Sequence, residues 1–206
     1  MAEIVYVLTN EAMPDIVKIG RTSTSVEDRI STLSSHSGVP LPFECYFAAV
    51  VPNATILERK LHRLFHNNEV NPRREFYRVD PERVVLAITI GDFEEITPGE
   101  SRLDEEDQIA LSRAKARRPR ISLERIGIYS GDTLELSRDD SITVSVISGN
   151  RVIYQDEELS LSEAALRALQ SLGYRTSSVS GSDYWMFEGE TLDERRRRIE
   201  AEQFEE

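Results

Sequence analysis

The sequence predicts an α+β protein with two folded units. Strand-like and helix-like patterns follow one another through the first 95 residues, which predicts a three-stranded antiparallel sheet flanked by helices. The composition then becomes strongly charged, and a second group of short alternating strands with one main helix begins near residue 121. A length of 206 residues also favours two domains over one.

The chain begins with a predicted β-hairpin. Residues 4–8 form an apolar strand-like segment, residues 9–15 hold the Asn and Pro of a turn, and residues 16–20 form a second strand candidate. An antiparallel hairpin of this length brings Tyr6 opposite or diagonal to Lys18. If both side chains point to the same face, they can reach one ligand.

The segment that follows carries the start signals of a helix. Ser25 is the expected N-cap, and Glu27 and Asp28 fall in the first turn, where acidic side chains complement the helix dipole. Arg29 therefore projects from an early helical turn. Residues 43–51 then form an apolar run that is typical of a strand, the third of the sheet.

A second helix is predicted from Ala54 to Phe65, because its apolar residues recur at helical spacing. Glu58 and His62 stand at positions i and i+4, one above the other on a single face. Glu58 lies in a strongly apolar stretch, where an unpaired carboxylate is costly, so a metal ion or a basic partner is expected beside it. A third helix is expected over residues 81–90.

These polar residues are of the types that phosphodiester hydrolysis needs. The reaction requires an activated water, neutralised charge on the phosphoryl oxygens and a Lewis acid near the leaving oxygen. Glu58 offers a hard oxygen ligand for Mg²⁺ or Mn²⁺. Arg29 and Arg21 offer planar forks for phosphate oxygens, and Lys18 offers a point charge. Tyr6 could accept a proton from water only if neighbouring cations or the metal lower its pKa from about 10.

Four motifs occur in order along the first half of the chain. They are Val5-Tyr6-Val7-Leu8, Val17-Lys18-Ile19-Gly20-Arg21-Thr22, Glu58-x-x-x-His62-x-x-Phe65 and Glu75-Phe76-Tyr77. In this order they resemble the GIY-YIG nuclease superfamily and, more narrowly, its phage Orf172-like branch, over residues 1–95. The resemblance implies a small antiparallel sheet flanked by helices that carries a one-metal phosphodiesterase site.

The resemblance also implies roles for individual residues. Tyr6 matches the first family tyrosine, Arg29 matches the helix arginine that contacts phosphate, and Glu58 matches the glutamate that holds the divalent ion. His62 and Tyr77 match positions characteristic of the branch. The expected site is therefore Tyr6, Lys18, Arg29 and His62 for catalysis, Glu58 for the metal ion, and Arg21, Tyr77 and Lys60 for substrate binding.

Lys18 stands where the family has its second tyrosine, and three interpretations of it stay open. It lowers the pKa of Tyr6, or it acts as the base itself when desolvated, or it binds phosphate in a domain that has lost catalysis. The sequence therefore favours a metal-dependent DNA endonuclease, with a non-catalytic DNA-binding or regulatory protein as the alternative. RNA is a further candidate substrate, because a phosphate clamp does not read the sugar.

Residues 96–120 are predicted to be a charged linker. The chain is acidic and irregular from Gly91 to Asp107 and basic from Arg113 to Arg120, with a short helix expected near Leu103 to Ala116. The basic patch could hold phosphates, or it could bind an acidic surface of its own chain.

Residues 121–192 are predicted to be a small β-rich domain. Its expected strands are Thr133–Leu136, Ile142–Ile147, Arg151–Tyr154 and Tyr184–Phe187, with a hairpin turn at 148–150, a polar loop at 177–183 and a helix from Ser160 to Gly173. Ser160 and Glu163 form a capping box at the start of that helix.

The motif Ser160-Leu161-Ser162-x-Ala164-Ala165, followed by Tyr184-Trp185, resembles the RAMA-like module of restriction and modification proteins. The resemblance implies an accessory module that recognises DNA. Trp185 is either a stacking surface for a base or, as a single Trp in an apolar strand, part of the core. Residues 193–206 are predicted to form a charged helical tail that extends into solvent.

The charge of the chain restricts how it could bind DNA. The formal net charge is −12, whereas nucleic-acid binders usually carry a basic footprint. We therefore expect a local cationic cleft near Lys18, Arg21, Arg29 and Lys60, with weak, salt-sensitive and metal-dependent binding. The single Cys predicts no internal disulfide and a reducing cytoplasm, and no apolar run approaches a membrane span.

Overall fold

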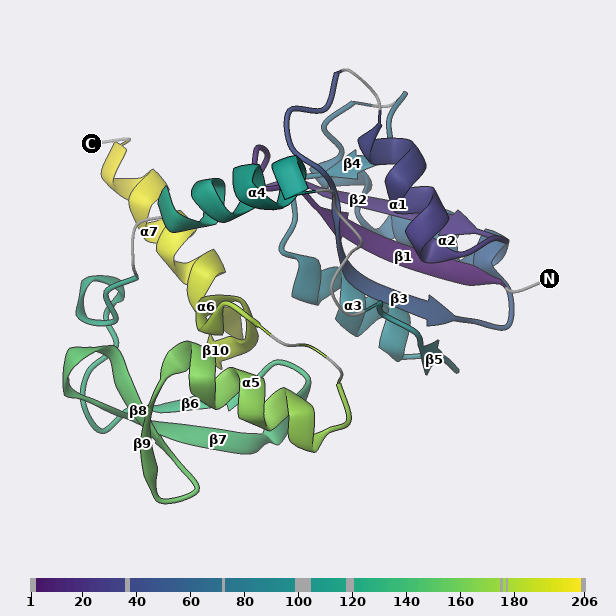
Figure 1. The fold of residues 1–206 in the computed structure, drawn as a ribbon. Helices are drawn as coiled ribbons and strands as arrows, with labels where there is room; N and C mark the ends of the chain where they lie inside the picture. Colours follow the sequence, from purple (N-terminus) through teal and green to yellow (C-terminus); the bar gives the residue numbers. More distant parts are fainter. Residues whose placement is uncertain are drawn as a thin grey trace. The chain divides into compact units, whose positions relative to one another are not determined.

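The computed structural model describes residues 3–35, 38–71, 73–98, 105–117, 121–174, 176 and 178–204. Over these residues the chain is α+β, as predicted, with seven α-helices and two antiparallel sheets of five and six strands. It divides into two compact units, Met1–Arg118 and Pro119–Glu206 (Figure 1). No helix in the described part of the chain is long and apolar enough to cross a membrane.

The first unit is built on a five-stranded antiparallel sheet in the order β4-β2-β1-β3-β5. Its strands are β1 (Ile4–Thr9), β2 (Val17–Thr22), β3 (Glu44–Val50), β4 (Phe76–Tyr77) and β5 (Glu94–Glu95). The three long central strands are those that the sequence predicts, but the predicted total of three was wrong. The two edge strands have two residues each, so no alternating pattern reveals them, and only backbone pairing in the folded chain creates them.

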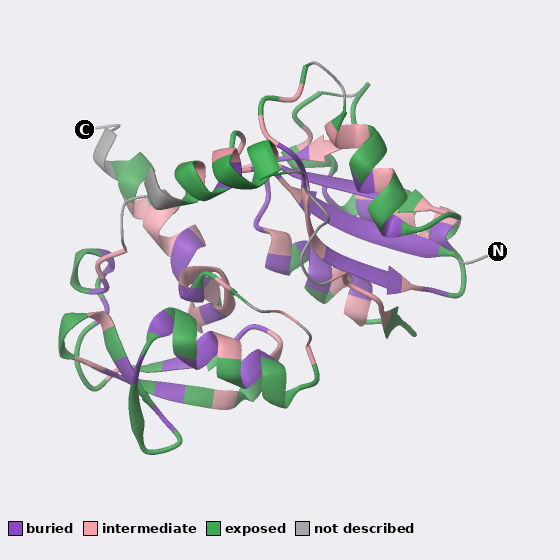
Figure 2. Cartoon of the chain, in the orientation of Figure 1, coloured by how far each residue is buried: buried purple, intermediate pink, exposed green. Residues whose placement is uncertain are grey.

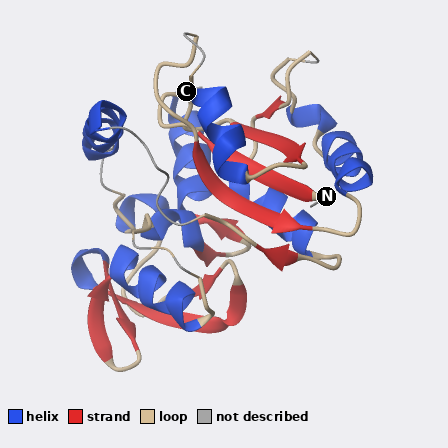
Figure 3. Ribbon diagram, turned by 45° about the vertical axis from the view of Figure 1, so that its right-hand side comes forward, coloured by secondary structure: helices blue, strands red, loops and turns tan. Residues whose placement is uncertain are grey.

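Helices cover both faces of this sheet. They are α1 (Val26–Ser34), α2 (Ala54–Leu64) and α3 (Pro81–Thr89), and Figure 3 shows helices on either side of the strands. Buried side chains of α1 pack with one face of the sheet, and those of α2 and α3 pack with the other. The Ser25 hydroxyl accepts a hydrogen bond from the backbone N–H of Asp28 at 3.0 Å, which confirms the predicted cap of α1.

The central strand β1 is buried on both faces (Figure 2). Val5 and Val7 belong to the core on the α2 and α3 side, and Tyr6 and Leu8 belong to the core on the α1 side. This alternation follows from the two-residue repeat of a strand. Tyr6 therefore shares a face of the sheet with α1.

The pairing of β1 with β2 fixes the neighbours of Tyr6. Tyr6 lies directly opposite Gly20, and Leu8 lies opposite Lys18, so Lys18 is diagonal to Tyr6 on the same face. The phenol lies across the backbone of Gly20, because a Cβ placed there would be 2.6 Å from the Tyr6 hydroxyl oxygen. Glycine at this position makes room for the aromatic ring.

The predicted linker contains helix α4 (Glu105–Arg117), close to its expected bounds. Leu111 of α4 is buried, and Lys115 Nζ lies 2.6 Å from Glu44 Oε1 at the start of β3. Part of the basic patch thus binds an acidic side chain of its own chain, which was the alternative to phosphate binding. Residues 99–104 and 118–120 of the predicted linker lie outside the described residues.

The second unit contains a six-stranded antiparallel sheet in the order β11-β10-β6-β7-β8-β9. Its elements are β6 (Thr133–Leu136), β7 (Asp139–Ile147), β8 (Arg151–Tyr154), β9 (Glu157–Ser160), α5 (Leu161–Ser171), α6 (Gly181–Tyr184), β10 (Trp185–Phe187), β11 (Glu190–Thr191) and α7 (Leu192–Phe204). The sequence missed β9 and β11, which are short and polar. It was also wrong for residues 181–184, which form a helical turn.

The packing of the second unit decides between the two alternatives for Trp185 and corrects the expectation about residues 193–206. Trp185 is fully buried and donates its indole N–H to the carbonyl of Leu161 at 2.9 Å, so it belongs to the core and offers no stacking surface. The first turns of α7 are not a solvated extension. Leu192 is buried, and the Arg195 side chain donates a hydrogen bond of 2.8 Å to the carbonyl of Ile126. Only 13% of the Arg195 side chain is exposed.

The contact between Tyr6 and Gly20 predicts the effect of adding one methyl group. In Gly20→Ala the new Cβ meets the phenol at contact distances that real Cβ atoms do not show, so Tyr6 must move. We expect a loss of about 1–3 kcal/mol in the free energy of unfolding, measured by urea denaturation. Gly91→Ala is the control, because a Cβ at Gly91 meets no atom within 4 Å. Equal stability of the two variants would contradict this packing.

Candidate active site

The candidate site lies along the edge of β2. Strand β4 pairs with β2 only at Val17 and Lys18. In the described part of the chain, Gly20 to Thr22 therefore have no strand partner on that side. Side chains from both faces of the sheet can converge around this short free edge, which explains how groups from α1 and α2 come to share one site.

On the α1 side, Arg29 binds Tyr6. The Arg29 Nε atom donates a hydrogen bond of 3.1 Å to the phenol oxygen, and only 1% of Tyr6 is exposed. Because the phenol oxygen is occupied as an acceptor, its own hydrogen remains able to donate. Arg29 projects from the first turns of α1, as the sequence predicts.

The environment of Tyr6 raises its pKa. Burial is the largest cause, and the charges of Glu75 and Glu58 act in the same direction. The hydrogen bond and charge of Arg29 lower the pKa, but they offset only part of the rise. Without a metal ion, the neighbouring cations therefore do not lower the pKa of Tyr6 below its usual value, since desolvation of the charged form outweighs them.

Lys18 is held by Glu75, a residue of the site that sequence reasoning missed. Lys18 Nζ donates to Glu75 Oε2 at 2.6 Å and lies 5.2 Å from the centre of the Phe76 ring. Lys18 is buried, whereas the Glu75 side chain is 45% exposed. The sequence could have indicated Glu75, because it belongs to the motif Glu75-Phe76-Tyr77, whose tyrosine was already a predicted site residue.

The same ion pair affects the ionisation of Glu75. Partial burial works to raise its pKa, but the hydrogen bond and charge of Lys18 outweigh that effect, with help from the charges of His62 and Arg29. The pKa of Glu75 consequently lies below its usual value. Glu75 is thus in electrostatic contact with residues from both faces of the sheet.

On the opposite face, α2 supplies Glu58 and His62. Glu58 Oε2 accepts a hydrogen bond of 3.0 Å from Nε of Arg21, so the expected basic partner of this carboxylate is present. A ring nitrogen of His62, Nε2, lies 3.3 Å from the carbonyl oxygen of Ile19 on β2. The His62 ring also packs on Tyr77, with 5.4 Å between the ring centres.

Three of these side chains could hold a metal ion. One carboxylate oxygen each of Glu58 and Glu75 and one ring nitrogen of His62 lie within 4.8 Å of one another. Carboxylate oxygens and imidazole nitrogens are ordinary ligands of divalent cations. The donor set therefore fits a divalent cation, and Arg21 and Lys18 supply the hydrogen bonds that orient its two carboxylates.

Two predicted site residues are not placed to contact a substrate beside this group. Tyr77 is buried beneath His62, and burial raises its pKa to about 12, so it supports the imidazole and does not face solvent. Lys60 is exposed and follows Glu58 by two residues on α2, which places it roughly 200° around the helix from the carboxylate.

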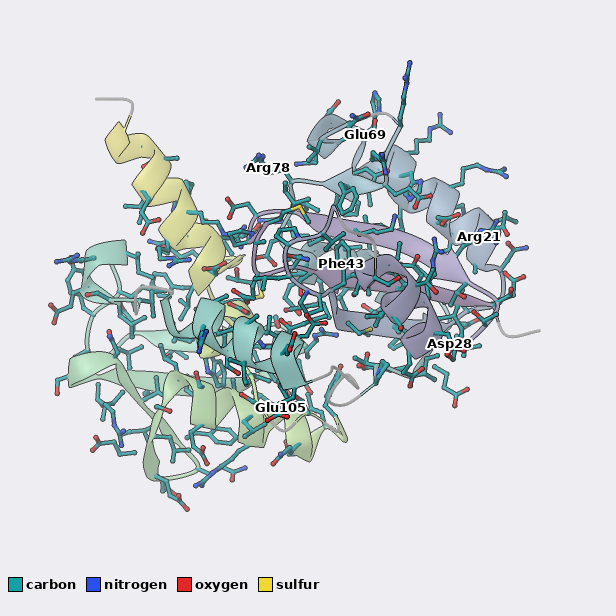
Figure 4. The ribbon with its side chains drawn as sticks, turned by 45° about the horizontal axis from the view of Figure 1, so that its top comes forward. Arg21, Asp28, Phe43, Glu69, Arg78 and Glu105 are labelled. Carbon is teal, nitrogen blue, oxygen red and sulfur yellow. The ribbon has the colours of Figure 1, made fainter. Side chains whose placement is uncertain are left out.

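A surface depression adjoins Arg29. Its volume is about 320 Å³, and its lining residues come from the end of β2, the loop that follows and α1. They are Arg21, Thr22, Ser23, Thr24, Asp28, Arg29 and Thr32. Figure 4 labels Arg21 at the end of β2 and Asp28 on α1. Two guanidinium groups beside hydroxyl groups are suited to binding phosphate oxygens.

Comparison with known proteins finds a related family for the first unit only. Residues 3–90 match the T5orf172 domain, a GIY-YIG-like phage domain associated with endonucleases. The match contains every predicted site residue and ends before α4 and the second unit. No curated protein and no solved structure matches the chain. A nuclease-like or DNA-binding role is therefore suggested for the first unit.

The Lys18–Glu75 pair predicts a pH-dependent stability. Because the folded pKa of Glu75 is depressed, its ionised form stabilises the fold above its usual value of 4.5, and this stabilisation is lost as the pH falls below that value. Near pH 7, Glu75→Gln should lower the free energy of unfolding by about 0.5–1 kcal/mol, a modest figure because Glu75 is partly exposed.

Urea denaturation at about pH 7 and about pH 3 measures this effect. The difference between the unchanged chain and Glu75→Gln should shrink at the lower pH. Glu94→Gln, at an exposed position on β5, should unfold like the unchanged chain at both values. A difference for Glu75→Gln that is the same at both pH values would rule out the ion pair as its cause.

Proposed function

We propose that the chain is a metal-dependent endonuclease that hydrolyses DNA phosphodiesters on a GIY-YIG scaffold formed by residues 1–95. One observation supports the proposal: two arginines, a buried tyrosine and a potential metal-ligand set gather around one free strand edge. Arg29 contacts Tyr6 and also lines the depression, which connects the groups on the α1 side to open surface. The match to the T5orf172 domain supports the same reading.

In this proposal the arginines bind the scissile phosphate. Arg21 and Arg29 line the depression together and would donate to the phosphoryl oxygens, which gain negative charge in the transition state. Arg21 must then share its guanidinium between Glu58 and the phosphate. It contacts Glu58 through Nε, so among the described residues both terminal nitrogens remain for phosphate.

Tyr6 and Lys18 would act through position and charge. The raised pKa of Tyr6 keeps its phenol protonated near neutral pH, so it would donate a hydrogen bond to the attacking water or to a phosphoryl oxygen. Lys18 is fixed by Glu75. That pairing favours the interpretation of Lys18 as a charge that attracts phosphate, and it disfavours Lys18 as a free base.

Mg²⁺ or Mn²⁺ is the proposed cofactor, held by Glu58. When bound, such an ion would withdraw charge from the phosphate and lower the pKa of a coordinated water. His62 would support the ion or the water from the same face of α2, and Tyr77 would keep the imidazole in place. The chain's own contribution is to orient these groups and to exclude solvent from Tyr6.

The second unit is proposed to be a RAMA-like accessory module that recognises DNA, in a cytoplasmic protein of restriction or phage defence. Residues 119–206 carry 18 acidic and 10 basic side chains. The run Arg195–Arg198 pairs with carboxylates of the same unit, notably Asp193 and Glu190. Recognition by this unit would therefore depend on groups other than these four arginines, and phosphate binding would fall mainly to the first unit.

One observation favours the alternative of a non-catalytic DNA-binding or regulatory protein. Tyr6 is almost fully buried with a raised pKa, and Lys18 is already paired. A domain that had lost catalysis would need only the phosphate-binding arginines. Under this alternative, DNA binding persists after chelation of divalent metals and no DNA is cut.

Plasmid cleavage in the presence of Mg²⁺ or Mn²⁺ tests the proposal. Glu58→Gln and Arg29→Ala should each lower the cleavage rate by about 100-fold or more, because each removes a group that stabilises transition-state charge. Tyr6→Phe keeps the ring and removes only the hydroxyl, so it should lower the rate by about tenfold or more.

Glu94→Gln serves as the matched control, since its carboxylate lies on β5 at the far edge of the sheet. It should cut like the unchanged chain. Equal cutting by Glu58→Gln and the unchanged chain would refute the site assignment. DNA binding that survives EDTA, with no cleavage under any metal, would instead establish the alternative. Competition between DNA and RNA of one sequence identifies the substrate.

A further inference from the structure

Glu75 is the member of the polar cluster to which the proposed function gives no chemical task. It precedes β4 and contacts Lys18 through one carboxylate oxygen, Oε2. Among the described residues, its other oxygen has no hydrogen-bond donor. Glu58 is arranged in the same way, with Oε2 on Arg21. Each carboxylate thus has one oxygen fixed by a cation of the chain and one oxygen still able to bind a ligand.

We propose that Glu58, His62 and Glu75 together form a three-ligand site for a divalent transition-metal ion, and that this site binds Mn²⁺ in preference to Mg²⁺. The inference rests on the proposed function in one respect, because Glu58 is the ligand that both share. It adds two ligands and a metal preference.

The positions of the three side chains fit a single ion. Their ligand atoms lie within 4.8 Å of one another. Three ligands equally spaced around one ion, each about 2.1 Å from it, are about 3.0–3.6 Å apart. Each ligand atom would therefore need to move by about an ångström or less to reach coordination distance. Glu58 and His62 are fixed relative to each other by one turn of α2, and Glu75 is fixed by the ion pair with Lys18.

The contact of His62 with β2 determines which ring nitrogen can accept a metal ion. A backbone carbonyl oxygen only accepts, so the 3.3 Å contact with Ile19 requires that Nε2 donates. In the neutral ring the lone pair is then on Nδ1. A metal-binding imidazole commonly donates its other N–H to a backbone carbonyl, which fixes the tautomer and the ring orientation. The packing of the ring on Tyr77 restricts it further.

The mixed ligand set determines which ion is preferred. Mg²⁺ binds oxygen ligands in near-ideal octahedral geometry and keeps several waters. Carboxylate oxygens suit both Mg²⁺ and Mn²⁺, whereas an imidazole nitrogen is a ligand for transition metals. Two carboxylates with one imidazole therefore favour Mn²⁺ over Mg²⁺. The positive charges of Arg21 and Lys18 offset the two carboxylates in the absence of a metal, so the site can assemble without one.

Titration of the full chain with Mn²⁺ in the absence of DNA tests this site directly. Electron paramagnetic resonance of free Mn²⁺ counts the ions bound, and competition with Mg²⁺ measures the preference. We expect one Mn²⁺ per chain, displaced only by an excess of Mg²⁺ of about tenfold or more. Glu75→Gln and His62→Gln should each weaken Mn²⁺ binding by about tenfold or more, because each removes a ligand.

Two matched controls distinguish ligands from general charge effects. Glu94→Gln removes an exposed carboxylate at the far edge of the sheet, and His66→Gln removes an imidazole beyond the end of α2. Both should bind Mn²⁺ like the unchanged chain. Circular dichroism during heating verifies that each variant is folded at the temperature of the titration.

The possible outcomes separate this inference from the proposed nuclease function. Mn²⁺ binding that depends on Glu58 but is unchanged in Glu75→Gln and His62→Gln would overturn the three-ligand site and leave a one-carboxylate nuclease intact. No Mn²⁺ binding, or equal affinity for Mg²⁺, would also overturn it. Binding that requires all three residues in a chain that cuts no DNA would support the metal site and refute the nuclease.

Discussion

The antiparallel register of β1 and β2 is the constraint on which the rest of the site depends. It sets Tyr6 over Gly20 and Lys18 diagonal to it, and the missing side chain of Gly20 is what admits the phenol. A slip of one residue would turn Tyr6 to the other face of the sheet, away from Arg29. Because β4 covers only the first part of β2, the rest of this edge stays open to groups from both helices.

The electrostatics of the site show how an acidic protein could bind a polyanion. Lys18, Arg21 and Arg29 face one strand edge, and each already has a partner in Glu75, Glu58 or Tyr6. These partners hold the cations in fixed positions and desolvate them in part. Local organisation of charge, and not the net charge of −12, therefore determines what this surface can attract.

The two units use their charges differently. In the first unit, cations surround a depression and a potential metal site. In the second unit, the arginines of α7 form ion pairs with carboxylates of the same unit, and Trp185 is part of the core. Any contact of the second unit with nucleic acid must therefore come from other surface groups. The pairing of the α7 arginines is consistent with a division of tasks between the units.

The sequence by itself determined the three central strands, α1 to α3, the cap at Ser25 and the shared face of Glu58 and His62, because strand alternation, helical spacing and capping are local properties. The order of its motifs also predicted the aromatic, basic and acidic residues of the candidate site. Only the tertiary structure decided the two edge strands, the role of Glu75 and the direction of the pKa shift of Tyr6. Those depend on burial and on contacts between residues far apart in the chain, which no local pattern encodes.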